Sequence, residues 1–416
     1  MRILLSAFAF SPCRGGEAAV GWNIANELAK LHDVTVLCGD VRGDMRTKKE
    51  LEQYVRQLSG LRIEYVAPTR FVALLERMHH IPGFWGLYYW AYNLWQRRAY
   101  ARTRVLHRER PFDIVHQLNM IGYREPGYLW KLPVPFVWGP VGGGPNEPLS
   151  FHSMFSWPGC AKVALRTAIN ELQKRICLRA KNAAKAARKV WAVTDADYRM
   201  IHDLWGVDCE KMVETGTVLR DEGRVRGWDG TSPLRIVWSG IHTSRKALPI
   251  LLHALARLGR KGIRVDILGA GPETRSWMSL AKSLCLDGAL TWHGQVTHDA
   301  ALKIMESGHI FAFPSLKEGT PHVVLEALSL GLPVICHDSC GMGTVVTEDC
   351  GVKIPLKDPQ TSIDGFVKAI CAMIDNPAII AQKSAAALAR AKELTWTANA
   401  LKMADVYESI VNNRTV

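Results

Sequence analysis

The chain has 416 residues, of which 48% are hydrophobic and 22% are charged. This composition is typical of a soluble globular protein, excludes a disordered chain and is sufficient for two domains. Lys and Arg outnumber Asp and Glu by 52 to 39, and the whole excess lies in residues 1–200, which hold 29 basic and 16 acidic side chains. Such a basic half favours an anionic partner: nucleic acid, an anionic membrane or a phosphorylated ligand. A merely solvated basic face is the alternative.

The first strand is predicted at the very start of the sequence. "MRILLSAFAF" has a basic start and a short apolar run, but no small-residue cleavage site ends that run, so we interpret it as a strand and not as a signal peptide.

The ten cysteines show no C-x-x-C pair and no metal-like spacing with histidine. We therefore expect reduced thiols in a cytoplasmic protein without metal or cofactor.

Apolar strands alternate with helices through the N-terminal half. A helix is predicted over residues 17–31, and strands are predicted at "RILLSAF", "DVTVLCG", "LRIEYVA", "FDIVHQL", "VPFVWGP" and "KVWAVT". Short, nearly all-apolar strands separated by helices are typical of a parallel sheet covered on both faces. We expect a Rossmann-like, doubly wound α/β domain over residues 1–218, followed by a Gly-rich and charged linker over residues 219–233.

The C-terminal half repeats the scheme over residues 234–395. Strands are predicted at "LRIVWSG", "IRVDILGAG", "ALTWHG", "HIFAFPS" and "LPVICHD", and helices are predicted to start near Ala247, Glu273, Ala300 and Pro321. A last helix, residues 396–416, is expected to cross back to the first domain. Two such domains would face each other across a cleft, with ligands bound at the carboxyl ends of the strands.

Two glutamates stand out in "SLKEGTPHVVLEALSLGLPVICHD", residues 315–338. Glu326 lies inside an apolar helical run and Glu318 just before it, and a buried carboxylate needs a partner. Thr320 is the expected N-cap and Pro321 the first helical residue. A helix start binds anions, so a phosphate there would place an attached ribose about 7–8 Å along the axis, near Glu326. Glu318 could then contact a sugar on the far side of a diphosphate; solvated surface charges are the alternative.

The same residues resemble a known family. "EGTPHVVLE" matches the E-x7-E signature of the retaining glycosyltransferases of family 4, which have the GT-B fold. The resemblance covers nearly the whole chain and is closest from "VDILGAG" to Asp338. "WAVTDADYRMI" and "DIVHQ" match segments of the family's first domain, and "FVWGPVGGG" is similar to members that elongate bacterial surface polysaccharides.

The resemblance implies roles for individual residues. Glu318 would hold the donor sugar and Lys246 the phosphates, and both are expected to be catalytic. His116 would lie near the reacting centre as a third catalytic residue, Glu326 would bind the ribose, and Glu17 would lie near the acceptor. The other residues expected to bind the nucleotide sugar are Gly15, Gly16, Gly240, Arg245, Gly269, Gly271, Gly319, Thr320, His322 and Val323.

The sequence departs from the family pattern in two places. The phosphate clamp of the family resembles G-R-x-x-x-x-K-G, whereas this chain reads "SGIHTSRKALP", with Ile241 at the arginine position. Arg245 is the alternative cation, although consecutive residues point in different directions. In addition, Cys340 and Thr344 replace a glycine and a glutamate of the family.

The resemblance implies transfer of a sugar from a nucleoside-diphosphate sugar to a saccharide acceptor, lipid-linked in the assembly of a cell-surface polysaccharide or lipopolysaccharide. It also implies retention of configuration and no metal. Asp195 and Asp197 have the D-x-D spacing of metal-dependent transferases, but we interpret them as helix-capping residues. The alternatives are transfer to a small soluble acceptor, a nucleotide-sugar epimerase of the same fold, and a non-enzymatic scaffold.

An aromatic segment precedes a cluster of arginines in "IPGFWGLYYWAYNLWQRRAYARTRVLHRERP". Basic helices with aromatic edges bind anionic bilayer surfaces, so we expect peripheral attachment to the inner face of the cytoplasmic membrane. Core packing of Trp85, Tyr88, Tyr89 and Trp95 is the alternative. No nucleic-acid-binding module is recognisable, and nucleic acid is not expected as a partner.

Overall fold

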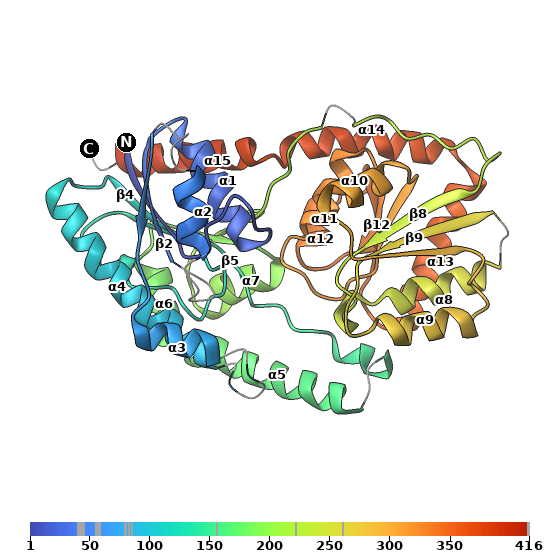
Figure 1. The fold of residues 1–416 in the computed structure, drawn as a ribbon, viewed down its shortest axis with the longest axis horizontal. Helices are drawn as coiled ribbons and strands as arrows, with labels where there is room; N and C mark the ends of the chain where they lie inside the picture. The colour runs from blue at the N-terminus through green and yellow to red at the C-terminus, as the bar shows by residue number, and fades with distance from the viewer. Residues whose placement is uncertain are drawn as a thin grey trace. The chain divides into compact units, whose positions relative to one another are not determined.

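The computed structural model describes residues 1–413 except residues 40–45, 55–59, 79–80, 82–83, 85, 155–156, 221–222 and 260–261. The chain divides into two compact units, each built on a parallel sheet (Figure 1). Unit 1 comprises Met1–Gly144, Leu172–Glu214 and Trp396–Val416, and unit 2 comprises Pro145–Glu171 and Thr215–Thr395. Two Rossmann-like domains are thus confirmed, while the expected domain limits, the linker and the cleft stay predictions.

The sheet of unit 1 has the order β3-β2-β1-β4-β5-β6-β7. Its strands are β1 (Arg2–Ala7), β2 (Asp33–Cys38), β3 (Leu61–Tyr65), β4 (Ile114–Asn119), β5 (Phe136–Val141), β6 (Lys189–Ala192) and β7 (Glu210–Lys211). The six strands predicted for this half are confirmed. The seventh was not predicted, because two exposed residues carry no apolar pattern.

Helices cover both faces of this sheet. They are α1 (Glu17–Ala29), α2 (Arg46–Tyr54), α3 (Arg70–Met78), α4 (Leu87–Glu109), α6 (Leu178–Ala186), α7 (Asp195–Arg199) and α15 (Trp396–Asn412). Helix α5 (Trp157–Ile176) begins in unit 2 and ends in unit 1. Successive residues of β1 point to opposite faces. Ile3 packs with residues of α1 and α15, whereas Leu4 packs with residues of α4 and α6. The C-terminal helix α15 therefore completes the core of unit 1.

The sheet of unit 2 has the order β10-β9-β8-β11-β12-β13. Its strands are β8 (Leu234–Ser239), β9 (Ile263–Leu268), β10 (Leu290–Gly294), β11 (Ile310–Phe313), β12 (Val334–His337) and β13 (Gly351–Ile354). Its helices are α8 (Leu248–Leu258), α9 (Thr274–Ser283), α10 (His298–Glu306), α11 (His322–Ser329), α12 (Cys340–Val345), α13 (Pro359–Asp375) and α14 (Ala378–Glu393). The five predicted strands are confirmed, the sixth was missed, and the four predicted helix starts are each one or two residues off.

Both strand orders reverse direction at one place, between β1 and β4 in unit 1 and between β8 and β11 in unit 2. Ligands of open α/β sheets bind at this reversal, outside the carboxyl ends of the strands. The loops after these four strands are therefore where a site is expected.

No helix in the described part of the chain combines the length and the apolar character that crossing a bilayer requires.

Candidate active site

Three charged side chains meet at the strand reversal of unit 2. The loop after β8 ends in a 3-10 turn, Ser244–Lys246, and the loop after β11 carries Glu318. Arg245 Nη1 and Lys246 Nζ each lie 2.7 Å from Oε1 of Glu318, and Ser315 Oγ donates to the same oxygen at 2.7 Å. These contacts bring together three of the residues that sequence analysis assigned to donor binding.

The side chains of Lys246 and Glu318 are only 9% and 10% exposed. Burial lowers the pKa of Lys246, while the neighbouring carboxylate acts to raise it. Burial acts to raise the pKa of Glu318, but Lys246 and Arg245 outweigh burial and lower it below its usual value. The carboxylate is therefore ionised, and the two cations leave one surplus positive charge that suits an anionic ligand.

Arg245 supplies a cation beside Lys246, and its role in place of an arginine at position 241 stays a prediction. Ile241 is 62% exposed, whereas Arg245 reaches the loop after β11, where Nη1 also donates to the backbone oxygen of Lys317 at 2.9 Å. Although Arg245 and Lys246 are consecutive, both contact the same carboxylate oxygen. A second cation is thus present, supplied from a position four residues after the usual one.

Helix α11 begins next to this cluster. The expected N-cap at Thr320 is wrong by one residue: Pro321 is the N-cap, because its ψ of 119° is extended, and His322 is the first helical residue. In the first turn, Val324 N donates to the backbone oxygen of Pro321 at 3.0 Å, while the N–H groups that precede it have no intrahelical acceptor. Farther along α11, Oε1 of Glu326 lies 2.8 Å from Nε2 of His298, and the side chain of Glu326 is 26% exposed.

Sequence analysis did not predict the partner of Glu326, which is His298. His298 opens α10, and its pKa is raised chiefly by the hydrogen bond to Glu326. The two residues are 28 positions apart, and nothing in that spacing predicts a pair. His322, in the first turn of α11, is held by Thr215, whose Oγ1 lies 2.9 Å from its Nδ1.

The glycines after β8 and β9 permit close packing of two loops. A Cβ at Gly269 would lie 2.0 Å from the carbonyl oxygen of Gly240, and a Cβ at Gly271 would lie 2.5 Å from that of His242. Gly269 also has φ +109°, which favours glycine. The backbone of Gly319 is approached in the same way, because a Cβ at Gly341 would lie 2.0 Å from its oxygen.

In unit 1 the loops after β1 and β4 meet at Glu17. Gly16 has φ +64°, and a Cβ at Gly15 or Gly16 would meet nothing within 4 Å, so this backbone is open to a ligand. The carboxylate of Glu17 accepts a hydrogen bond from Ile121 N at 3.1 Å. Burial raises the pKa of Glu17 to about 7, and Glu214 adds to the rise.

His116 lies in the interior of unit 1. Its Nδ1 is 2.6 Å from the hydroxyl of Tyr407, its Nε2 is 2.5 Å from the carbonyl oxygen of Gly139, and the residue is 0% exposed. Burial lowers its pKa to about 4. His116 was expected near the reacting centre. Its two ring nitrogens are engaged inside unit 1, by Tyr407 of α15 and by Gly139 of β5, and a catalytic role of His116 stays a prediction.

The capping interpretation of the D-x-D pair is confirmed for Asp197 and not for Asp195. Thr194 is the N-cap of α7 and forms a capping box with Asp197, which also accepts a hydrogen bond from Gly144 N at 2.7 Å. Asp195 forms an ion pair with Lys211 at 2.7 Å. Asp197 thus caps α7 and holds the backbone at Gly144, whereas Asp195 is paired with Lys211.

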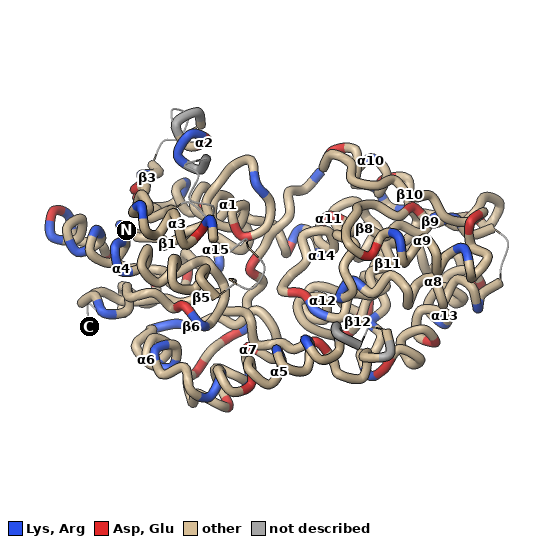
Figure 2. The backbone as a smooth tube through the Cα atoms, turned by 60° about the horizontal axis from the view of Figure 1, so that its bottom comes forward, with Lys and Arg blue, Asp and Glu red and all other residues tan. Residues whose placement is uncertain are grey.

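The aromatic segment is divided between the core and the surface. Trp95 is 1% exposed and Tyr88 packs against the same core, whereas Tyr89 is 42% exposed. Core packing therefore holds for two of the four aromatics named above, and Trp85 lies outside the described residues. Basic residues recur along α4 and α6, as Figure 2 shows.

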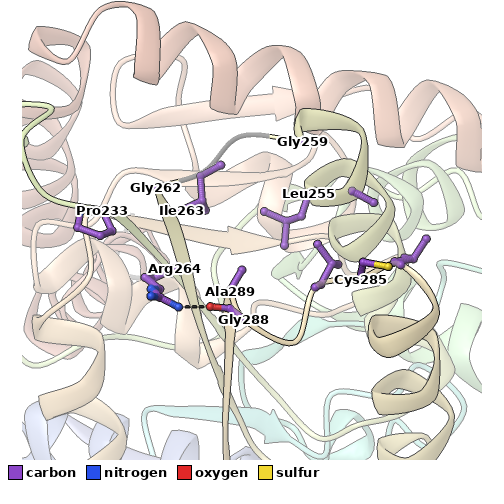
Figure 3. Close-up of a pocket in the computed structure, with 12 residues that line it drawn as sticks. Pro233, Leu255, Gly259, Gly262, Ile263, Arg264, Cys285, Gly288 and Ala289 are labelled. Atoms are coloured by element: carbon purple, nitrogen blue, oxygen red, sulfur yellow. Dashed lines mark hydrogen bonds between the residues drawn. The ribbon is translucent and has the colours of Figure 1, made fainter.

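One cavity of unit 2, about 560 Å³ in volume, lies at the opposite ends of the strands (Figure 3). Pro233, Ile263 and Ala289, which line it, stand just before or at the beginning of β8, β9 and β10. The guanidinium of Arg264 donates to the backbone oxygen of Gly288 there. None of the predicted donor-binding residues lines this cavity, so it is separate from the cluster around Glu318.

Comparison with known proteins gives the family of the C-terminal half. Residues 233–376 match the family described as "Glycosyl transferases group 1". These residues carry the Arg245–Lys246–Glu318 cluster. They form a group 1 glycosyltransferase domain. The expectation of a glycosyltransferase is thereby confirmed.

A curated relative extends the similarity of this glycosyltransferase over most of the chain. The D-inositol 3-phosphate glycosyltransferase of Kineococcus radiotolerans is 25% identical over 403 residues, which cover 89% of this chain and 86% of the relative.

Solved structures of similar fold span both units. The lipopolysaccharide outer core galactosyltransferase WaaB, in its apo form, superposes with a TM-score of 0.65 at 14% identity, covering 98% of this chain and 99% of that one. HepE of Anabaena in complex with UDP superposes with a TM-score of 0.62 at 15% identity, covering 98% and 100%. At such identities these similarities show the fold alone, which confirms the GT-B class of the glycosyltransferase.

Proposed function

We propose that this glycosyltransferase moves a sugar from a nucleoside-diphosphate sugar to a saccharide acceptor, with retention of anomeric configuration. The observation that carries the proposal is the shared contact of Arg245 and Lys246 with Glu318 at the strand reversal of unit 2. A diphosphate supplies the anion that the surplus charge of this cluster favours. HepE, which has the same fold, has been solved with UDP, and this supports a nucleoside diphosphate as the ligand.

The chemistry needs stabilisation of a leaving phosphate. The bond between the anomeric carbon and the phosphate oxygen breaks, the acceptor oxygen bonds to that carbon on the same face, and the acceptor proton passes to the departing phosphate. Preorganised cations and N–H dipoles near the leaving group lower the barrier. We assign this role to Lys246, Arg245 and the first turn of α11. No metal is assigned a role, because these groups supply the positive charge.

Glu318 and Glu326 are proposed to hold the two ends of the donor. Glu318 lies beside the phosphate cations, so its carboxylate is in place for the hydroxyls of the transferred sugar. Glu326 lies farther along α11, where a carboxylate suits the vicinal diol of a ribose. Its present partner, His298, is exposed and comes from another helix. A small soluble acceptor and epimerisation of the nucleotide sugar remain alternatives.

The acceptor is proposed to bind to unit 1, near Glu17. A saccharide carried on a lipid fits the surplus charge of the N-terminal half, because a basic surface is attracted to an anionic bilayer. The name of the WaaB structure, an outer core galactosyltransferase of lipopolysaccharide, supports an acceptor of this kind. We therefore propose assembly of a cell-surface polysaccharide or lipopolysaccharide at the inner face of the cytoplasmic membrane.

The decisive experiment screens the whole chain against nucleoside diphosphates and their sugars by thermal shift. A ligand at 100 times its dissociation constant adds about 2.7 kcal/mol of stability. Nuclear magnetic resonance of the product with the best donor then reports its anomeric configuration. Absence of stabilisation by every nucleoside diphosphate contradicts donor binding, and an inverted product contradicts retention. A changed sugar nucleotide without any acceptor identifies an epimerase.

A further inference from the structure

Unit 1 contains a cavity of about 500 Å³ that has none of the predicted site residues in its wall. It lies between α3, α4, α6 and the loop after β4. Its wall consists of Phe71, Tyr89, Trp90, Asn93, Leu94, Arg97, Glu125 and Arg179. A volume in this range, with aromatic walls and a few convergent polar groups, is typical of a site for a small ligand.

One stripe of α4 forms the largest part of this wall. Trp90, Asn93, Leu94 and Arg97 follow the i, i+3, i+4, i+7 spacing that places side chains on one face of a helix. The neighbouring face of α4, which carries Tyr92 and Trp95, is buried against the sheet. Within the cavity stripe, Leu94 packs against the small cluster of Val72, Leu75 and Ala91, whereas Trp90 is left 67% exposed.

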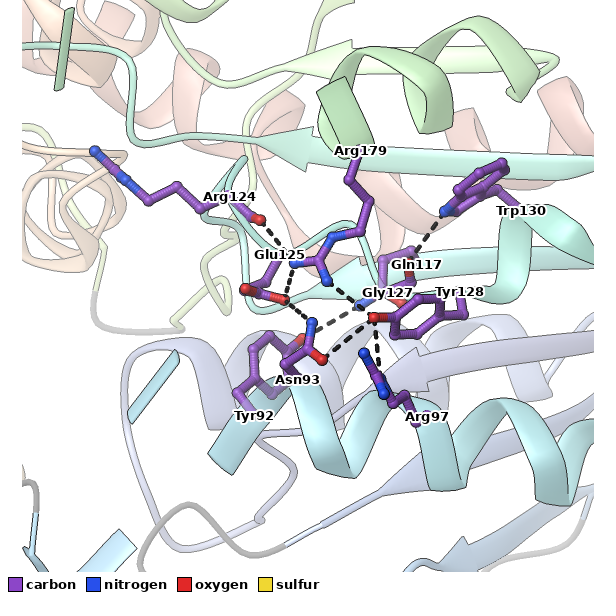
Figure 4. A network of polar contacts seen from close by, with 10 residues as sticks. All are labelled: Tyr92, Asn93, Arg97, Gln117, Arg124, Glu125, Gly127, Tyr128, Trp130 and Arg179. Atoms are coloured by element: carbon purple, nitrogen blue, oxygen red, sulfur yellow. Dashed lines mark hydrogen bonds and ion pairs between the residues drawn. The ribbon is translucent and has the colours of Figure 1, made fainter. Parts of the chain in front are cut away.

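The floor of the cavity is a fixed polar network (Figure 4). The guanidinium of Arg179 forms an ion pair with Glu125 and donates to the hydroxyl of Tyr128 at 3.0 Å. Asn93 Nδ2 donates to Oε2 of Glu125, and the hydroxyl of Tyr128 donates to Oδ1 of Asn93, both at 3.2 Å. Because each group positions the next, the floor is preorganised.

Arg97 differs from Arg179 in what its guanidinium contacts. Its Nε donates to the hydroxyl of Tyr128 at 3.3 Å, and its guanidinium lies over the ring of Tyr128. Among the described residues no carboxylate pairs with Arg97, whereas Arg179 is neutralised by Glu125. The cavity thus presents one guanidinium without a counter-charge, and a guanidinium binds a carboxylate in a two-pronged geometry.

The loop after β4 connects this cavity with the expected acceptor residue. Ile121 N, near the start of the loop, donates to Glu17, and Glu125, four residues later, is part of the cavity floor. Four residues span at most about 14 Å, roughly the length of two or three linked sugar rings. A saccharide chain could therefore reach from Glu17 to the cavity.

We propose that this cavity binds a sugar of the acceptor chain that carries a carboxylate, such as a uronic acid. The exposed rings of Trp90 and Tyr89 pack against the apolar face of the sugar. Asn93 and Glu125 form hydrogen bonds with its hydroxyl groups, and Arg97 forms an ion pair with its carboxylate. This assignment rests on the proposed transfer to a saccharide, and it specifies that the acceptor is acidic.

A lipid surface is the competing occupant, since Phe71 is 56% exposed beside the cavity. The floor favours a saccharide. Hydrocarbon would cover Arg97, whose charge no carboxylate among the described residues balances, and burying an unpaired charge costs free energy. Hydroxyl groups, by contrast, both donate and accept hydrogen bonds and so match every polar group of the floor.

The test compares matched pairs of disaccharides by saturation-transfer difference NMR on the whole chain. The probes are cellobiouronic acid against cellobiose, and digalacturonic acid against galactobiose. In the unmodified protein we expect one acidic member to bind at least about fivefold more tightly than its neutral counterpart. Arg97→Gln should abolish this preference, and Trp90→Ala should weaken binding of both members about tenfold. Arg104→Gln, an exposed arginine of α4 outside the cavity, is the matched control and should change neither.

Three results would overturn the assignment. The first is equal binding of acidic and neutral members, and the second is no binding of any probe. The third is loss of sedimentation with phosphatidylglycerol vesicles in both cavity variants while disaccharide binding is unchanged, which would identify a lipid surface. Nucleoside-diphosphate binding, measured in the same samples, tests the donor site independently and shows that the variants are folded.

Discussion

Lys246 Nζ lies 2.7 Å from Oε1 of Glu318, although the two residues come from loops that follow different strands. Arg245 shares this oxygen. An anion that binds to the two cations must therefore compete with the carboxylate of Glu318. Donor binding and the position of Glu318 are coupled, and this coupling can be measured.

The first prediction concerns Glu318→Gln. The amide keeps the shape but removes the competing charge, so we expect nucleoside diphosphate to bind about tenfold more tightly, equivalent to about 1.4 kcal/mol. Turnover should fall at least about 100-fold, because the amide replaces the carboxylate proposed to hold the donor sugar. Isothermal titration calorimetry and initial rates measure the two effects. Weaker nucleotide binding in this variant would contradict the competition.

The second prediction concerns the replacement cation. Lys246→Ala and Arg245→Ala should each reduce kcat/KM about 100-fold or more, because each removes a charge from the leaving phosphate. Adding Ile241→Arg to Arg245→Ala should restore part of the loss. Arg264→Ala, in the cavity at the other end of the strands, is the control and should leave kcat/KM unchanged. Full activity of Arg245→Ala would show that Lys246 acts without it.

The sequence predicted much of this cluster and not its internal contacts. Glu318 and Lys246 were found because their motifs have fixed spacing along the chain. Arg245 was left open, because the direction of two consecutive side chains depends on the 3-10 turn that carries them. His298 was missed, since its contact with Glu326 joins two helices that only the sheet order brings together.

The third prediction separates the two aspartates of the D-x-D pair. Asp197→Ala should lower the free energy of unfolding by about 1–2 kcal/mol, because it removes the capping box of α7 and the acceptor of Gly144 N. Asp195→Ala should cost less than about 1 kcal/mol, since its ion pair with Lys211 is exposed. Urea denaturation measures both. A large loss of activity in folded Asp195→Ala would contradict a purely local role.

The fourth prediction concerns stability against pH through His116. Its pKa is about 4 in the folded chain against 6.5 as a free side chain, so the unfolded state binds the extra proton between these values. The folded state should thus lose up to about 3 kcal/mol from this group as the pH falls from 6.5 to 4. His116→Gln should be less stable at pH 7 and should show a smaller loss over that range. Chemical denaturation of both proteins from pH 4 to 8 measures the difference.

A catalytic role would give a different result for the same variant. If His116 contacts the sugar, kcat of the folded His116→Gln protein falls at least about 100-fold at pH 7. If it ties Tyr407 to the sheet, kcat changes little and the free energy of unfolding changes instead, because the hydroxyl and the carbonyl oxygen of Gly139 lose their partner. Measuring kcat on material shown to be folded distinguishes the two roles.

The sequence by itself determined what depends on neighbours along the chain. The apolar runs of most strands, the capping role of Asp197 and the seven-residue interval between Glu318 and Glu326 are local, and they were recognised from the sequence. Tertiary structure decided which charges meet and which histidine is buried. The parallel sheet brings the loops after β8 and β11 together across more than 70 residues, and α15 adds Tyr407 to His116 from 291 residues away. Contacts of that kind depend on strand order, which no local pattern records.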